Sequence, residues 1–139
     1  MILEEDSLLI LSYDTATDIL SVNWPDLIDT PMPEIENSLH KLAKSIAHFD
    51  VKKLLLDLST SVIGVDENQY LKLILDFMNS LTATRLEKMA RVMASNPAQE
   101  DRLLEFSRDI KTQVYLPFQT KSFNNKTDAL LWLMETTKY

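Results

Sequence analysis

The side chains that could do chemistry in this sequence are two histidines, several carboxylates and a few hydroxyl groups. His40 and His48 lie eight residues apart on one expected helix, too far for a local pair of metal ligands, and His40 has no H-E-x-x-H context. Glu34 and Glu36 fall in a first helical turn, where the helix dipole already favours negative charge. These residues therefore predict neither a metal site nor a general acid–base pair.

Nucleophilic catalysis has no better support. Ser59, His48 and Asp57 supply the residue types of a Ser–His–Asp triad, but Gly64 is the only glycine and cannot build a nucleophile elbow. The same lack of glycine excludes glycine-rich phosphate loops. The chain has no cysteine, which excludes disulfides, thiolate catalysis and zinc–thiolate sites. We expect no catalytic residue, no metal and no cofactor, and a protein that is not an enzyme.

Composition sets the class of protein. The 139 residues fit one domain, 1–139, with an ordinary globular content of 45% hydrophobic residues. The net charge of −7 argues against nucleic acid and anionic membranes as partners, because both require clustered Lys and Arg. The N-terminus has no basic segment, and the longest apolar runs are far below the ~20 residues of a membrane span. We expect a cytoplasmic protein without a membrane span.

The first half of the chain predicts a hairpin, a helix and a strand. Residues 8–13 and 19–24 are apolar runs joined by the turn-forming segment 14–18, a pattern typical of an antiparallel hairpin. A helix is expected to start near Pro31 and to run to about Phe49. It has a single apolar stripe at helical spacing, made by Ile35, Leu39, Leu42, Ile46 and Phe49. The unbroken run 54–58 then favours a parallel strand covered on both faces.

The second half alternates helices with strands. Asp66, with Gln69 three residues later, is typical of a capping box opening a helix to Leu81. Glu87–Ala94 fits either an extension of that helix or a strand; we predict a strand, because a helix of about 30 residues would be unusual. Beyond it we expect a helix capped by Asn96, a short strand at Gln113–Leu116 limited by Pro117, and a last helix capped within Asn124–Asp128.

The resulting order is β-β-α-β-α-β-α-β-α. It predicts an α/β fold with a single-layer, mixed and mostly parallel sheet of about five strands, opened by an N-terminal hairpin and covered by four helices. The cations Lys52, Lys53, Arg85, Lys88 and Arg91 are scattered, and a solvated face is their expected place.

The segment Leu54-Leu55-Leu56-Asp57-Leu58-Ser59 resembles the L-L-x-D-L-S strand of STAS domains, the sulphate transporter and anti-sigma-factor antagonist family. In that family the strand ends in a loop followed by a helix N-terminus. The opening hairpin and the apolar final helix Ala129–Leu133 look more like a bacterial offshoot described as STAS/CRAL-TRIO-like. The resemblance implies an open sheet with helices, no intrinsic catalysis, and a function in binding a partner or ligand.

One departure from the family pattern concerns regulation. Signalling members of the family place a phosphorylatable Ser or Thr, followed by Gly, at the start of the helix after D-L-S. Here that region holds Asp66-Glu67-Asn68, so the acceptor hydroxyl is missing. Asp66 is explained by helix capping alone; the alternative is that it supplies a permanent negative charge where relatives gain one by phosphorylation.

Two sets of residues are candidate binding sites. The first follows the interior strand and would contact a protein partner: Ser59, Thr60, Ser61, Asp66 and Glu67. The second belongs to a helix that is more apolar than one buried face requires, and to the segment after it: Tyr70, Ile74, Phe77, Met89 and Met93. These side chains fit the monomer core, a homodimer face or a lipid-like pocket. The expected function is a regulatory or protein-interaction module, and the alternative is a carrier for a small apolar molecule.

Overall fold

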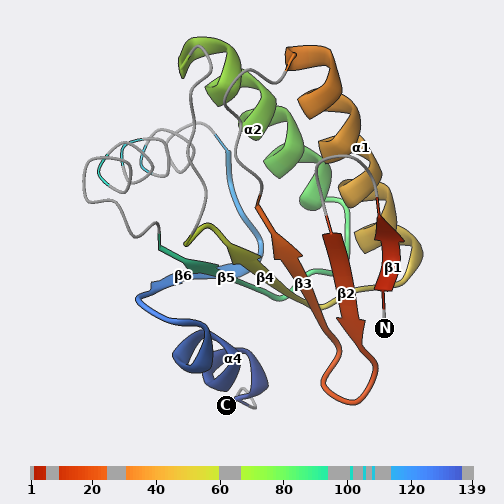
Figure 1. The fold of residues 1–139 in the computed structure, drawn as a ribbon, viewed down its shortest axis with the longest axis vertical. Coiled ribbons are helices and arrows are strands. Elements are labelled where there is room, and N and C mark those ends of the chain that lie inside the picture. Colours follow the sequence, from red (N-terminus) through yellow and green to blue (C-terminus); the bar gives the residue numbers. More distant parts are fainter. Residues whose placement is uncertain are drawn as a thin grey trace.

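A computed structural model describes residues 2–5, 10–24, 31–59, 67–93, 101, 105, 108 and 114–135 of the chain. The fold is α/β, with one mixed sheet of six strands that lie in chain order (Figure 1). The strands are β1 (Ile2–Glu5), β2 (Ile10–Asp14), β3 (Ile19–Asn23), β4 (Lys53–Asp57), β5 (Lys88–Val92) and β6 (Gln119–Phe123). The helices are α1 (Met32–His48), α2 (Glu67–Leu81) and α4 (Lys126–Met134).

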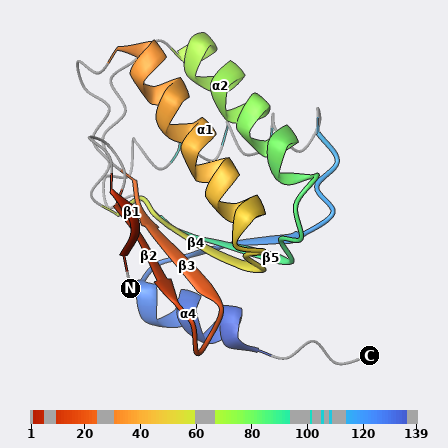
Figure 2. The ribbon, with the colours of Figure 1, turned by 90° about the vertical axis from the view of Figure 1, so that its right-hand side faces the viewer.

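The sheet is antiparallel at its N-terminal end and parallel beyond it. β1, β2 and β3 pair antiparallel, while β3, β4, β5 and β6 pair parallel. Because β3, β4 and β5 follow one another in space, α1 and α2 cross over on the same face and lie side by side, whereas α4 lies on the opposite face (Figure 2). The predicted α/β class and the β2–β3 hairpin are confirmed. The expectation that this hairpin opens a sheet of about five strands is wrong, because β1 precedes it and the sheet has six strands.

The hairpin turn is fixed by two aspartates. The Asp14 carboxylate accepts a hydrogen bond of 2.9 Å from the Ala16 N–H, and the Asp18 N–H donates to the Asp14 carbonyl at 2.9 Å. Asp18 has a φ of 58°, a left-handed conformation that aspartate tolerates better than most residues. Its carboxylate accepts a hydrogen bond from the Tyr13 hydroxyl, which together with burial raises the pKa of Tyr13 to about 12.

β4 is the interior strand that its unbroken leucine run predicts. Leu54 and Leu56 belong to the large core beneath α1 and α2, whereas Leu55 points to the other face and joins a smaller cluster under α4. All three leucines are buried. A strand covered on both faces has no solvated side, and this is why its sequence does not alternate.

α1 follows its predicted stripe except at the end. Pro31 is the N-cap, and Ile35, Leu39, Leu42 and Ile46 are buried. Phe49, expected on the buried stripe, is instead 45% exposed, because the helix ends at His48 and the chain turns at its C-cap.

The segment after α2 confirms the strand expected at Glu87–Ala94. The Thr82 and Thr84 hydroxyls donate to the carbonyls of Asn79 and Leu81 at 2.6 and 2.7 Å. These bonds satisfy carbonyls of the last helical turn, so the helix ends and β5 follows as a strand.

The strand expected at Gln113–Leu116 is wrong over its described residues 114–116, because β6 begins only at Gln119. Pro117 lies between the two, so the ladder forms only on its C-terminal side, where Gln119 N–H donates to the Glu87 carbonyl at 2.9 Å. The cap predicted for the last helix is confirmed: the Asn125 side chain accepts a 2.8 Å hydrogen bond from the Asp128 N–H.

Two predicted features lie outside the described residues. The first is the Asp66 cap of α2. The second is most of the helix expected after Asn96, of which the structure describes Asp101, Glu105 and Arg108 as helical and exposed. Among the described residues, no helix is long and apolar enough to cross a membrane.

Candidate functional site

The parallel strands end side by side at one edge of the sheet, and this edge is the candidate site. In the strand register Asn23 of β3 lies beside Asp57 of β4, and Asp57 lies beside Val92 of β5. Asn23 is exposed and Asp57 is partly exposed. Open α/β sheets commonly bind their ligands just beyond the carboxyl ends of their strands. We refer to Asn23, Asp57 and Ser59 as the carboxyl edge.

Asp57 shapes the chain where it leaves β4. Its Oδ1 accepts hydrogen bonds from the Ser59 N–H at 3.0 Å and from the Ser59 hydroxyl at 2.6 Å. A carboxylate bonded to the backbone two residues on forms an Asx turn, which directs the chain away from the strand. The D-L-S residues of the sequence motif therefore hold a defined turn at the end of the interior strand.

The backbone of this turn is tied to both neighbouring strands. The Trp24 N–H donates to the Asp57 carbonyl at 2.9 Å, and the Leu58 N–H donates to the Val92 carbonyl at 3.1 Å. These bonds extend the sheet ladder past the last residues of β3 and β4. The position of Ser59 is thus set by the sheet as well as by the Asx turn.

The geometry excludes a Ser–His–Asp triad. His48 ends α1, which leads into the start of β4, whereas Ser59 follows the end of β4. The five residues of β4 span roughly 16 Å at about 3.3 Å per residue, so His48 lies at the opposite edge of the sheet. The Asp57 carboxylate instead accepts the Ser59 hydroxyl hydrogen directly.

Ser59 is the one predicted partner-binding residue whose side chain the structure describes. Thr60, Ser61 and Asp66 lie outside the described residues, and Glu67 is described only as the first residue of α2. The carboxyl edge also includes Asn23, which the sequence pattern does not single out. Its position as the last residue of an expected strand, in a sheet of parallel neighbours, is the signal that could have found it.

A buried hydrogen bond ties the start of α2 to the end of β3. The Trp24 indole N–H donates to the Tyr70 hydroxyl at 3.1 Å, and both side chains are buried. Burial raises the pKa of Tyr70 above its ordinary value, and the hydrogen bond from Trp24 opposes that rise. The first turn of α2 is therefore fixed close to the carboxyl edge.

The second predicted set fills the interior of one chain. Tyr70, Ile74, Phe77 and Met89 are buried in the large core with α1, β3 and β4, whereas Met93 is partly exposed. The excess apolar surface of α2 is used to cover the sheet and to contact α1. These four side chains are therefore almost completely covered within one chain.

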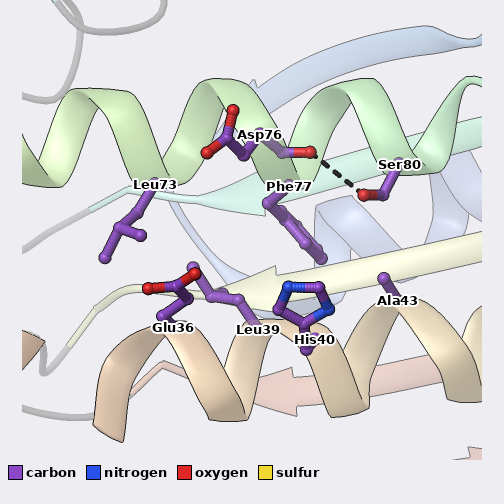
Figure 3. Close-up of a pocket in the computed structure, with 8 residues that line it drawn as sticks. All are labelled: Glu36, Leu39, His40, Ala43, Leu73, Asp76, Phe77 and Ser80. Carbon is purple, nitrogen blue, oxygen red and sulfur yellow. Dashed lines mark hydrogen bonds between the residues drawn. The ribbon is translucent and has the colours of Figure 1, made fainter. Parts of the chain in front are cut away.

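A shallow groove of about 180 Å³ lies between α1 and α2, and Figure 3 shows its lining. Leu73 and Phe77 point from α2 toward α1, and His40 points from α1 toward α2. The remaining lining residues are Glu36, Leu39, Ala43, Asp76 and Ser80. The Ser80 hydroxyl donates to the Asp76 carbonyl at 3.1 Å. No group of three His, Asp or Glu in the described part of the chain is arranged to hold a metal ion.

A second groove, of about 420 Å³, separates the β2–β3 hairpin from α4. Its lining is rich in hydroxyl groups, with one cation from Lys126 and one carboxylate from Asp14. Ser12 and Ser21 face each other across β2 and β3 in this groove. The uncovered part of this sheet face is thus polar.

Lys88 is the described residue that departs furthest from its expected place. The sequence predicts a solvated face for Lys88, but the residue is only 7% exposed. Its ammonium donates to the Trp132 carbonyl at 3.0 Å and to the Glu135 carbonyl at 3.1 Å, at the C-terminal end of α4. Two-residue periodicity could have shown the burial, because Lys88 shares a strand face with Ala90 and Val92.

Comparison of the chain with protein-family models, with curated proteins and with solved structures finds no match. The resemblance of Leu54–Ser59 to the STAS motif therefore stays a prediction. The function is inferred from the arrangement of the side chains alone.

Proposed function

We propose that this protein is a non-enzymatic regulatory module that works by binding a protein partner through its carboxyl edge. The observation that carries the proposal is the pinned turn after β4. Asp57 holds Ser59 through two hydrogen bonds, and the neighbouring strands hold the backbone on both sides. A surface held in one conformation loses little entropy on binding, and this favours specific recognition.

The chemistry of the edge indicates the kind of partner. Asn23 offers an amide and Asp57 a carboxylate that is partly exposed, on a chain with a net charge of −7. Opposite charge on a partner would steer its approach to such a surface. We expect a partner segment that presents Lys or Arg together with hydrogen-bond donors.

The proposal includes kinship with STAS domains, with the partner contact made in place of a phosphorylation switch. Its support is that the D-L-S residues end the interior strand and that a helix, α2, comes next in chain order. The carrier for a small apolar molecule gains no comparable support, because Tyr70, Ile74 and Phe77 are committed to the core.

Site-specific photo-cross-linking tests the proposal. A benzophenone amino acid replaces Asn23 at the carboxyl edge, and in a second variant it replaces Asn79, an exposed asparagine near the C-terminal end of α2. Both sites start from the same residue type and are exposed. After irradiation in cells, we expect a discrete protein adduct from position 23 and none from position 79.

Two results would contradict the proposal. Equal adducts from both positions would show unspecific contact, and the absence of an adduct from position 23 would remove the carboxyl edge as the binding surface. Circular dichroism of both variants checks that they remain folded.

A further inference from the structure

α4 is held to the sheet by a small contact that is separate from the main core. The cluster beneath it contains Ala129 and Leu133 from the helix and four buried residues from the strands: Ile19, Leu55, Ala90 and Val92. The large core under α1 and α2 is a different cluster on the other face of the sheet. The two sides of the sheet are therefore stabilised independently, except through the strands themselves.

The helix itself is weakly anchored by its side chains. Only Ala129 and Leu133 of its nine residues are fully buried. Leu130 and Trp132 are partly buried against the same cluster, whereas Leu131 is 56% and Met134 is 46% exposed. A helix of this length is marginal in water, because isolated helices need about 12–15 residues. On the hairpin side α4 borders the polar groove at Lys126 and Leu130. Tertiary contacts with the sheet must therefore supply its stability.

Lys88 makes a polar contact that joins β5 to the C-terminal end of α4. Its ammonium binds the Trp132 and Glu135 carbonyls and lies 4.9 Å from the centre of the Trp132 ring. The Trp132 carbonyl also accepts the N–H of the C-cap residue Glu135 at 3.2 Å. The last carbonyls of a helix carry its negative dipole end, which favours a nearby cation. The Lys88 side chain therefore links β5 directly to the C-terminal end of α4.

We infer that α4 is a latch that opens as a unit while the core under α1 and α2 stays folded, and that Lys88 sets how often it opens. The inference goes beyond the proposed function, because it concerns the face of the sheet that α4 covers. Opening uncovers Ile19, Leu55, Ala90 and Val92, an apolar strip across three strands.

Native-state hydrogen exchange of the full chain tests the latch. In the wild type we expect the amides of residues 130–134 to exchange through an opening that is much more frequent than the opening that exposes α1 and α2. The variant Lys88→Met keeps much of the apolar stem and removes the two charged hydrogen bonds. We expect it to speed exchange in α4 by at least about tenfold and to leave α1 nearly unchanged.

Lys121→Met is the matched control. Lys121 lies on the neighbouring strand β6, is exposed, and has its ammonium 5.4 Å from the centre of the Phe123 ring. The same substitution there is expected to leave α4 exchange unchanged. The latch is refuted if the amides of α4 and α1 exchange through one common opening. The wild-type protein alone is enough to test this. The latch is also refuted if Lys88→Met accelerates every helix equally, or if Lys121→Met matches its effect on α4.

Discussion

The hydrogen bond between Trp24 and Tyr70 gives the sharpest test of how the carboxyl edge is held. Tyr70→Phe keeps the aromatic ring and removes the oxygen that accepts the Trp24 indole N–H. Both side chains are buried, so water cannot replace the lost acceptor without a rearrangement. A buried donor left without a partner costs about 1–3 kcal/mol, and we expect the free energy of unfolding to fall by that amount.

The pH dependence gives a second, independent signature of the same residue. Burial holds the pKa of Tyr70 above its ordinary value in the folded state. Stability from the neutral phenol is therefore complete below the unfolded pKa of about 10 and is lost as pH rises toward the folded pKa. In that window one tyrosine lowers the free energy of unfolding by up to about 1.4 kcal/mol per pH unit. Tyr70→Phe should remove this share of the slope.

Urea unfolding followed by circular dichroism, at neutral pH and in steps above pH 10, measures both effects. Tyr115→Phe is the control, because Tyr115 is 85% exposed and its substitution should change stability by less than about 0.5 kcal/mol. A double-mutant cycle with Trp24→Phe isolates the coupling between the two rings. If Tyr70→Phe is as stable as the Tyr115→Phe control, the buried hydrogen bond does not exist as described. If Tyr70→Phe keeps the full alkaline slope, the slope does not come from a buried Tyr70 phenol.

Three further predictions concern other parts of the fold. Leu55→Ala, at a fully buried position, should cost about 2–5 kcal/mol in urea unfolding, whereas Leu131→Ala on the exposed face of α4 should cost less than about 1 kcal/mol; equal costs would refute the two-sided burial of β4. Asn125→Ala should destabilise α4 by about 0.5–2 kcal/mol in hydrogen exchange, and unchanged exchange would show that the cap is not formed. Ultraviolet titration at the phenolate band should lose a transition near pH 12 in Tyr13→Phe, and loss of a transition near pH 10 instead would refute the Tyr13–Asp18 bond.

The elements that the sequence predicts well are those fixed by local physics. The leucine run of β4 has no polar face, the segment 14–18 holds turn-forming residues, and Asn125 caps the helix that follows it. The choice of a strand for β5 succeeds because the helix before it ends at Thr82–Thr84. In each case the deciding interaction lies within a few residues along the chain.

The elements that the sequence misses become strands by pairing with a neighbouring strand, not through an apolar pattern of their own. β1 has only four residues, two of them acidic, and forms by pairing with β2 at the edge of the sheet. β6 is largely polar because it is an edge strand with little surface to bury. Its pairing with β5, rather than an apolar pattern, makes it a strand.

In the candidate site, too, the sequence predicts the local interactions and misses those between residues far apart in the chain. The Asx turn of Asp57 and Ser59 spans two residues and matches the motif read from the sequence. The Trp24–Tyr70 bond joins residues 46 positions apart, and Lys88 reaches carbonyls 44 and 47 positions away. The local sequence leaves Tyr70 open between the core and a binding surface and places Lys88 in solvent, because neither bonding partner is visible in it.

Native mass spectrometry of the protein, purified under gentle conditions from the cells that make it, tests the central claim most directly. The proposed module should carry the additional mass of a polypeptide, and replacing Asn23 with Glu at the carboxyl edge should remove it, because added negative charge repels a basic partner. A co-purified lipid mass, or a polypeptide mass that survives the change at Asn23, would contradict the assignment of this edge as the binding surface.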